Sequence, residues 1–144
     1  MHNDFYASGF LYNPLSQQIL LQQNLTDENA PWTLLEDEVG SGSFGEETFK
    51  DLVHKHLKIK LNLKKILYVY TRNAIGTEKD HSIYYAEIKR ARKSFMSKTS
   101  RFAWFNFKQL HKLNIAEQTK HDITVGQRVI ESTIRRSLGL RTIG

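Results

Sequence analysis

Two sets of side chains alternate over residues 5–12, one largely small or aliphatic and the other largely aromatic, which is the pattern of a β-strand with two faces. The turn signal Asn13-Pro14 follows and the apolar residues 19–21 come next, so this segment predicts a β-hairpin. Residues 32–35 predict a further short strand. We expect the acidic, Gly- and Ser-rich residues 36–45 to form a loop.

The spacing of apolar residues changes after this loop. Phe49, Val53 and Leu57 recur every four residues and predict an amphipathic helix. Ser43 and Glu46 fit the S-x-x-E capping box, so we expect the Ser43 side chain to cap the helix. Acidic residues in the first turn and basic residues in the last turn agree with the direction of the helix dipole.

Two longer strands are predicted in the second half of the chain. Residues 65–71 and 81–88 are rich in β-branched and aromatic side chains. The polar residues 73–80 between them predict a hairpin loop. A further strand is predicted over residues 101–107, followed by a short helical piece at residues 109–113.

The C-terminal part predicts a second helix. Thr124 and Gln127 fit another capping box, an apolar residue recurs every four positions from Ile130 to Leu138, and Gly139 is a stop signal. The order of strands, helix, strands and helix indicates an α+β fold. No Pro/Gly-rich linker divides the sequence, which predicts a single domain over its whole length, residues 1–144.

Composition narrows the class of protein. The chain has 21 Lys and Arg residues against 15 Asp and Glu residues, a net charge of +6 that favours anionic partners. It has no Cys, which excludes disulfides and thiolate metal sites. The longest apolar run, residues 66–70, is too short to span a bilayer, and the N-terminus lacks the pattern of a signal peptide. We therefore expect a cytoplasmic protein that does not contact membranes.

The order and spacing of these segments resemble the Nudix fold over almost the whole chain. The opening ASGFLYNPLSQQILLQQ is similar to the first hairpin of such domains, and WTLL to the short strand before their signature loop. ILYVYT, HSIYYAEI and the strand that contains Trp104 stand where the later elements of the family would. The resemblance implies a Nudix-like mixed β-sheet sandwiched between helices.

The signature of this family, the Nudix box, reads G-x5-E-x7-R-E-U-x-E-E-x-G-U, where U is apolar. In the ungapped register that we prefer, the two glycines of the box are replaced by Asp37 and Lys58, and its Arg is replaced by Asp51. The four glutamates of the box are replaced, in order, by Ser43, Leu52, Lys55 and His56. This register keeps Val39, Phe49, Val53, Leu57 and Ile59 at apolar positions. A register shifted back by one residue places Lys50 and Asp51 at Arg-Glu, but it would make Thr48, Leu52 and His56 the core stripe, so the apolar stripe decides against it.

The replacement of the box glutamates affects the metal-dependent chemistry that the resemblance implies. Family members use carboxylates on the box helix to hold Mg²⁺ or Mn²⁺, which activates water and neutralises phosphates. A Lys55 ammonium about 4 Å from a divalent ion would repel it by roughly 8 kcal/mol at an effective dielectric constant near 20. The resemblance therefore implies a domain that binds a nucleotide or another phosphorylated small molecule without a metal cofactor. We predict phosphate contacts from Gly42, Ser43, Lys55, Lys89, Arg90 and Arg92, and we expect the ligand to lie in the cleft between the box helix and the sheet.

Two alternatives stay open at this point. A divergent Nudix hydrolase would cleave a nucleoside diphosphate derivative with Mg²⁺ or Mn²⁺ held by rearranged carboxylates, for which Glu47, Asp51 and Glu87 are the candidates. A protein or RNA interaction domain would use the basic residues 89–101 and the C-terminal helix, although no RNA-binding signature supports it. The sequence does not fix the oligomeric state.

Overall fold

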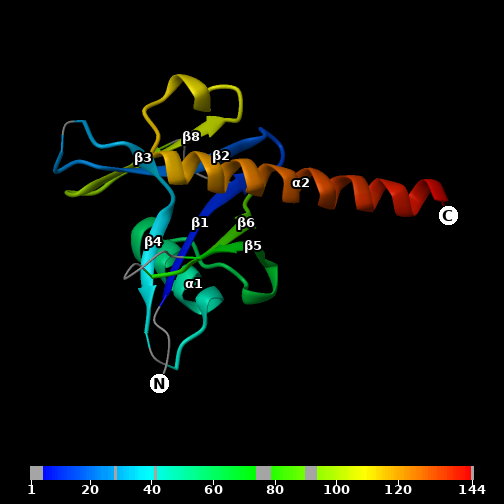
Figure 1. Ribbon diagram of the computed structural model, residues 1–144, viewed down its shortest axis with the longest axis horizontal. Helices are drawn as coiled ribbons and strands as arrows, with labels where there is room; N and C mark the ends of the chain where they lie inside the picture. Colours follow the sequence, from blue (N-terminus) through cyan, green and yellow to red (C-terminus); the bar gives the residue numbers. More distant parts are fainter. Residues whose placement is uncertain (1–4, 28, 41, 74–78, 90–93, 144) are drawn as a thin grey trace.

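The computed structural model describes residues 5–27, 29–40, 42–73, 79–89 and 94–143. A mixed β-sheet runs through its centre, and eight strands belong to it in these ranges (Figure 1). The strands are β1 (Phe5–Asn13), β2 (Gln18–Asn24), β3 (Trp32–Thr33), β4 (Leu35–Val39), β5 (Ile66–Arg72), β6 (His81–Glu87), β7 (Ser94–Met96) and β8 (Ser100–Asn106). Six of them follow the order β5-β6-β1-β2-β8-β7, in which β1 pairs in parallel with β6 and antiparallel with β2.

The sheet forks beside β1. The first half of β1, from Phe5 to Gly9, pairs antiparallel with β4, whereas its last residues, Leu11 to Asn13, pair with β2. The short strand β3 pairs with β2 instead of β1. Strands β2 and β4 therefore separate from each other along β1, and this fork positions the cavity of the protein.

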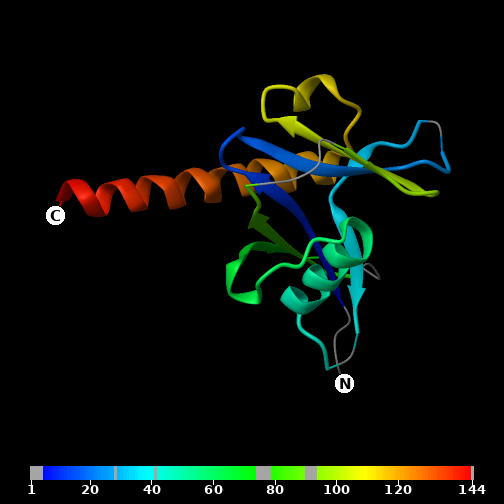
Figure 2. The same cartoon turned by 180° about the vertical axis from the view of Figure 1, so that it is seen from behind.

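Two helices cover opposite faces of the sheet, α1 (Gly45–Leu57) and α2 (Glu117–Ile143) (Figures 1 and 2). Alternate residues of β1 face them, because side chains on a strand point to the two faces in turn. Ala7 and Leu11 pack in the cluster that contains the buried face of α1, whereas Phe10 packs with Ile123 and Ile130 of α2. Two single turns, η1 (Leu63–Lys65) and η2 (Leu110–Lys112), complete the elements. The α+β fold with a mixed sheet between helices is confirmed.

The start of α1 differs from the sequence prediction. The helix begins at Gly45 after Phe44, and no side chain caps it, so the expected capping role of Ser43 is wrong. The backbone nitrogen of Ser43 instead donates to the carbonyl oxygen of Gly40 in the preceding turn. Gly45 itself is required by packing, because a Cβ atom there would overlap the hydroxyl of Tyr84.

Three other predictions need correction. Residues 36–39 belong to strand β4 and are not part of a loop, and β7 lies in a stretch that we had not predicted as a strand. Helix α2 begins at Glu117, before the predicted cap at Thr124, and continues through Gly139. Its first turns were missed because Thr119 and Asp122 are buried there, so the inward face is polar and shows no apolar periodicity.

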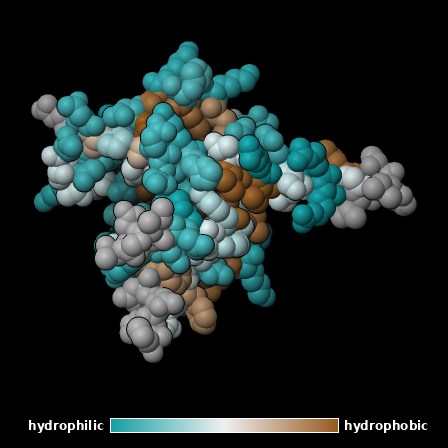
Figure 3. All heavy atoms as spheres, in the orientation of Figure 1, coloured by the Kyte–Doolittle hydropathy of each residue, from teal (hydrophilic) through white to brown (hydrophobic). Residues whose placement is uncertain are grey.

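The C-terminal half of α2 extends beyond the sheet (Figures 1 and 2). The surface seen in the view of Figure 3 is mostly hydrophilic, and apolar surface gathers beside α2 where the helix leaves the sheet. None of the helices in the described ranges has the length and apolar composition needed to span a membrane.

Candidate ligand-binding cavity

A cavity of about 900 Å³ opens on the α2 face of the sheet, at the fork beside β1. Its uncharged polar side chains are Ser8, Gln22, Asn24, Thr33, Gln118 and Thr119. Its titratable or charged side chains, apart from Tyr6, are Asp27, Glu36, Arg72, Lys79, His81 and Asp122. Hydroxyl and carboxamide groups from β1, β2, β3 and α2 therefore surround the space and can hydrogen-bond a polar ligand from several sides.

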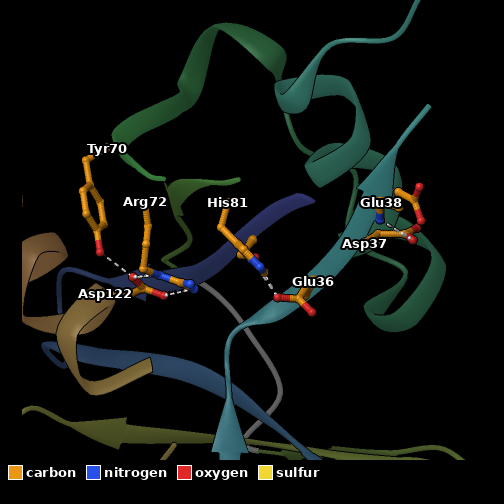
Figure 4. A network of polar contacts seen from close by, with 8 residues as sticks. Glu36, Asp37, Glu38, Tyr70, Arg72, His81 and Asp122 are labelled. Atoms are coloured by element: carbon orange, nitrogen blue, oxygen red, sulfur yellow. Dashed lines mark hydrogen bonds and ion pairs between the residues drawn. The ribbon is translucent and has the colours of Figure 1, made fainter. Parts of the chain in front are cut away.

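Asp122 of α2 anchors one wall of this cavity (Figure 4). Its side chain is only 3% exposed and accepts a hydrogen bond of 2.6 Å from the Tyr70 hydroxyl. It also accepts hydrogen bonds from Nε and Nη2 of Arg72, each at 3.3 Å. Burial and the nearby Asp122 carboxylate raise the pKa of Tyr70, so its hydroxyl remains a donor at neutral pH. This network ties the beginning of α2 to strand β5.

Glu36, His81 and Ser8 form a second polar cluster in the cavity. Nδ1 of His81 lies 3.1 Å from Oε1 of Glu36 and 3.4 Å from Oγ of Ser8, and Ser8 donates to the same Glu36 oxygen at 3.2 Å. Both contacts of the imidazole use one ring nitrogen. A Ser-His-acid relay needs one nitrogen for the nucleophile and the other for the acid, so this cluster is not a nucleophilic triad.

Each described basic side chain of the cavity contacts a carboxylate. Arg72 pairs with Asp122, His81 lies against Glu36, and Lys79 pairs with Glu38 beside the cavity. Among the described lining residues, basic side chains therefore do not outnumber the carboxylates. The cavity offers directed hydrogen bonds, which suit an uncharged polar group better than a phosphate.

Those ligand-binding residues predicted from the sequence that the structure describes lie outside the lining of this cavity. Gly42 and Ser43 are exposed in the turn before α1, Lys55 is exposed on α1, and Lys89 is exposed just after β6. Arg90 and Arg92 fall outside the described residues.

The carboxylates of the enzyme alternative are also exposed. Glu47 and Asp51 lie on α1, and Glu87 is the last residue of β6, where it pairs in register with Tyr12. None of these three carboxylates lines the cavity.

Helix α1 buries the apolar stripe on which the preferred register of the family box depends. Phe49, Val53 and Leu57 are all buried against the sheet, as predicted. Lys58 follows with a φ of 59°, a left-handed conformation that favours glycine, and in the register that we prefer it stands at the position of the final Gly of the family box. The buried side of α1 is filled by this packing, so the space between α1 and the sheet that we expected to be the ligand cleft is apolar core, and neither lined cavity includes a residue of α1.

A metal site of the family type would need carboxylate oxygens on α1, at the glutamate positions of the preferred box register. Leu52, at a box Glu position, is buried among apolar side chains. His56 lies with its ring 5.5 Å from that of Phe102, and burial and the neighbouring Lys55 lower its pKa. Within the described residues, no group of three or more His, Asp or Glu side chains is arranged to hold a metal ion. The donor set at these positions of α1 does not fit a divalent cation.

The sequence reasoning missed the residues that build the cavity, among them Glu36, Arg72, His81 and Asp122. Their contacts join residues 28, 50 and 73 positions apart in the chain. No spacing between neighbouring residues in the sequence can indicate pairs that lie so far apart in the chain. The only available signal was the alternation in LEDEV, which places Glu36 and Glu38 on one face of β4 and the apolar Leu35 and Val39 on the other.

Solved structures with the Nudix fold match this arrangement of elements. The NUDIX domain of Shewanella oneidensis NrtR, solved in complex with ADP ribose, matches with a TM-score of 0.70 at 14% identity over 90% of this chain and 90% of that chain. The Escherichia coli dihydroneopterin triphosphate pyrophosphohydrolase matches with a TM-score of 0.67 at 13% identity over 88% of this chain and 95% of that chain. The C-terminal domain of mouse MUTYH, solved in complex with human PCNA, matches with a TM-score of 0.68 at 10% identity over 90% of this chain and 91% of that chain.

These likenesses show that the chain has the Nudix fold, as its sequence led us to expect. No protein-family model matches the sequence, and no curated protein does.

Proposed function

We propose that this protein binds a nucleotide-like, phosphorylated small molecule in the cavity at the fork of the sheet, without the metal catalysis of Nudix hydrolases. The observation that carries the proposal is a large polar cavity, and it is combined with the register that we prefer, in which Leu52, Lys55 and His56 of α1 stand at positions of the family glutamates. The ADP ribose of the NrtR domain and the triphosphate substrate in the name of the E. coli enzyme support a ligand of this class.

The polar side chains of the cavity suit the base and ribose of such a ligand. Gln22, Asn24 and Gln118 each carry a carboxamide, which offers both a donor and an acceptor to a base edge. Thr33 and Thr119 add hydroxyl groups of the kind that pair with ribose hydroxyls. The paired cations of the cavity agree with an uncharged moiety at this position.

The phosphates of the ligand would extend out of the cavity past β4, toward the turn that follows this strand. Gly42 and Ser43 follow β4 and would meet the phosphates there, whereas Lys55 lies on α1, which covers the opposite face of the sheet, and would be reached only around the β4 edge. The ammonium group of a lysine can bind a phosphate directly, whereas a metal ion in the same role would need carboxylates to hold it. The same Lys55 would repel a divalent cation, which is the physical reason to separate binding from family-type hydrolysis here.

A calorimetric titration with EDTA present tests this proposal. ADP, ADP-ribose and GTP are titrated into the protein, and at least one should bind with a dissociation constant in the micromolar range, about −8 kcal/mol. Gln118→Ala should weaken that binding, because the side chain lines the cavity, whereas Gln127→Ala on the same helix lies outside it and should not. Absence of binding by all three nucleotides, or equal effects of the two variants, would contradict the proposal.

The hydrolase alternative retains one supporting observation, the pyrophosphohydrolase activity in the name of a protein with the same fold. It requires carboxylates beyond the usual box positions, for which Glu47, Asp51 and Glu87 remain the candidates. Incubation of the same nucleotides with Mn²⁺, followed by chromatography of the products, decides the matter. Turnover that is lost in Glu47→Gln or Asp51→Asn would replace the binding function with a catalytic one.

A further inference from the structure

A second cavity, of about 510 Å³, lies between the edge strand β5 and helix α2, away from the proposed nucleotide site. Its floor includes Tyr85 of β6, and its walls include Leu67 of β5 and Val129 of α2. Leu67 is 38% exposed and Tyr68, which also lines the cavity, is 54% exposed. Figure 3 shows the apolar surface beside α2 in this part of the molecule.

The cavity has the form of a groove that follows β5 and α2. At one end Tyr70 and Arg72 of β5 are bonded to Asp122 of α2, which closes the space between the two elements. Toward the beginning of β5, Leu67 faces later residues of α2, from Val125 to Arg136. Strand and helix therefore run alongside each other in opposite directions, and α2 continues beyond the sheet (Figures 1 and 2).

Strand β5 is the terminal strand of its side of the sheet, and in the described part of the chain its outer edge pairs with no other strand. An edge strand can accept an extended peptide by adding one more pair of main-chain hydrogen bonds per two residues. The side chains of such a peptide alternate, and every second one would point into the groove.

The charged side chains that line the groove indicate which residues a bound peptide would carry. Both charged side chains among its described lining residues are arginines, Arg128 and Arg136, and both are exposed on α2. Eight residues of helix separate them by about 12 Å. Four residues of an extended strand span about 13 Å and return a side chain to the same face. Two acidic residues four positions apart would therefore face the two arginines, and the central side chain would lie over the stretch between them, which is lined by Val129 and Ser132 of α2 together with Leu67 of β5.

We propose that the groove between β5 and α2 binds an extended peptide segment of a partner protein with the pattern acid-x-apolar-x-acid, added as a strand to β5. The arginines give preference for acidic residues, the apolar wall binds the central side chain, and the edge of β5 supplies main-chain hydrogen bonds. A second copy of this chain is a poor occupant, because its net charge of +6 opposes self-association through a basic groove.

The test is fluorescence anisotropy with three labelled peptides that share a Gly-Ser flank and differ in the cores Glu-Thr-Leu-Thr-Glu, Lys-Thr-Leu-Thr-Lys and Glu-Thr-Ser-Thr-Glu. The first should bind the intact protein at submillimolar concentration, and each of the others should bind at least about tenfold more weakly. Hydrogen exchange of the β5 backbone amides should slow when the first peptide binds, because strand addition protects them.

Two double variants separate the groove from general electrostatics. Arg128→Glu with Arg136→Glu reverses the charge of the groove, should weaken binding of the acidic peptide about tenfold and should favour the lysine peptide. Lys120→Glu with Arg135→Glu makes the same change of net charge on α2 outside the lining and should leave binding within about twofold. No binding of the acidic peptide at millimolar concentration, equal losses in the two double variants, or binding that leaves β5 exchange unchanged would overturn the proposal.

Discussion

Replacement of Asp122 by alanine removes the acceptor that holds one wall of the large cavity. The buried carboxylate accepts one short hydrogen bond from Tyr70, at 2.6 Å, and two longer ones from Arg72, at 3.3 Å. Hydrogen bonds to charged groups contribute about 1.5–3 kcal/mol each, and bonds near the outer distance limit contribute less. Arg72 also keeps 22% of its side chain exposed and can be rehydrated through the cavity, which lowers the penalty of losing its partner.

From these contributions, Asp122→Ala should lower the free energy of unfolding by about 3 kcal/mol, close to the lower end for a broken buried ion pair. The melting temperature should fall by about 10 °C for a domain of this size. Urea unfolding followed by the fluorescence of Trp32 and Trp104 measures the change directly. Asp27→Ala removes an exposed acid from the same cavity and should cost less than about 1 kcal/mol.

A double-mutant cycle with Tyr70→Phe identifies the source of the loss. Because the Tyr70 hydroxyl donates to Asp122, the two substitutions should show a coupling free energy of about 1–2 kcal/mol. A loss below about 1 kcal/mol for Asp122→Ala, or a coupling indistinguishable from zero, would refute the reasoning that this network fixes the start of α2 to β5.

Three further predictions concern local features of the fold. Lys58→Gly should raise the free energy of unfolding by about 0.5–1 kcal/mol in urea titrations, since φ is 59° there, and no gain would contradict the left-handed assignment. Gly9→Ala should destabilise the protein by about 2 kcal/mol or more, because its Cβ would lie 2.5 Å from the Tyr84 carbonyl oxygen, and a neutral effect would show that β1 and β6 are less closely packed. Burial and nearby Glu46 raise the pKa of Tyr84 to about 12, above the ordinary value of 10.0, so its contribution to stability is full below pH 10 and declines as the pH rises toward 12. The urea midpoint should therefore fall between pH 10 and pH 12, and Tyr84→Phe should reduce that fall, whereas equal slopes for both proteins would argue against a shifted tyrosine.

The parts of the fold that could be predicted are those in which burial is apolar and local. The stripe Phe49, Val53 and Leu57 predicts α1 because each residue packs on the same face four positions from the last. Strands β5 and β6 were predicted within about one residue, because their β-branched and aromatic content is high over seven consecutive positions. The resemblance to the Nudix fold rests on the order of such segments.

The parts that could not be predicted are those in which buried groups are polar. Asp122 and Thr119 are buried at the beginning of α2, where their polarity hides the helix from an apolar pattern. Glu36 and Glu38 make β4 look like an acidic loop, although Leu35 and Val39 fix it as a strand. Both errors fall on the elements that line or border the cavity, because a polar cavity requires polar side chains inside the fold.

A crystal structure of the protein soaked with ADP-ribose and Mn²⁺ examines the central claim most directly. The account predicts nucleotide density in the cavity bounded by Gln22, Thr33 and Gln118, with its phosphates on lysine or arginine side chains and no Mn²⁺ beside α1. Density for Mn²⁺ at about 2.2 Å from carboxylate oxygens next to α1 would contradict it, since a divalent cation could then bind despite Lys55 and His56.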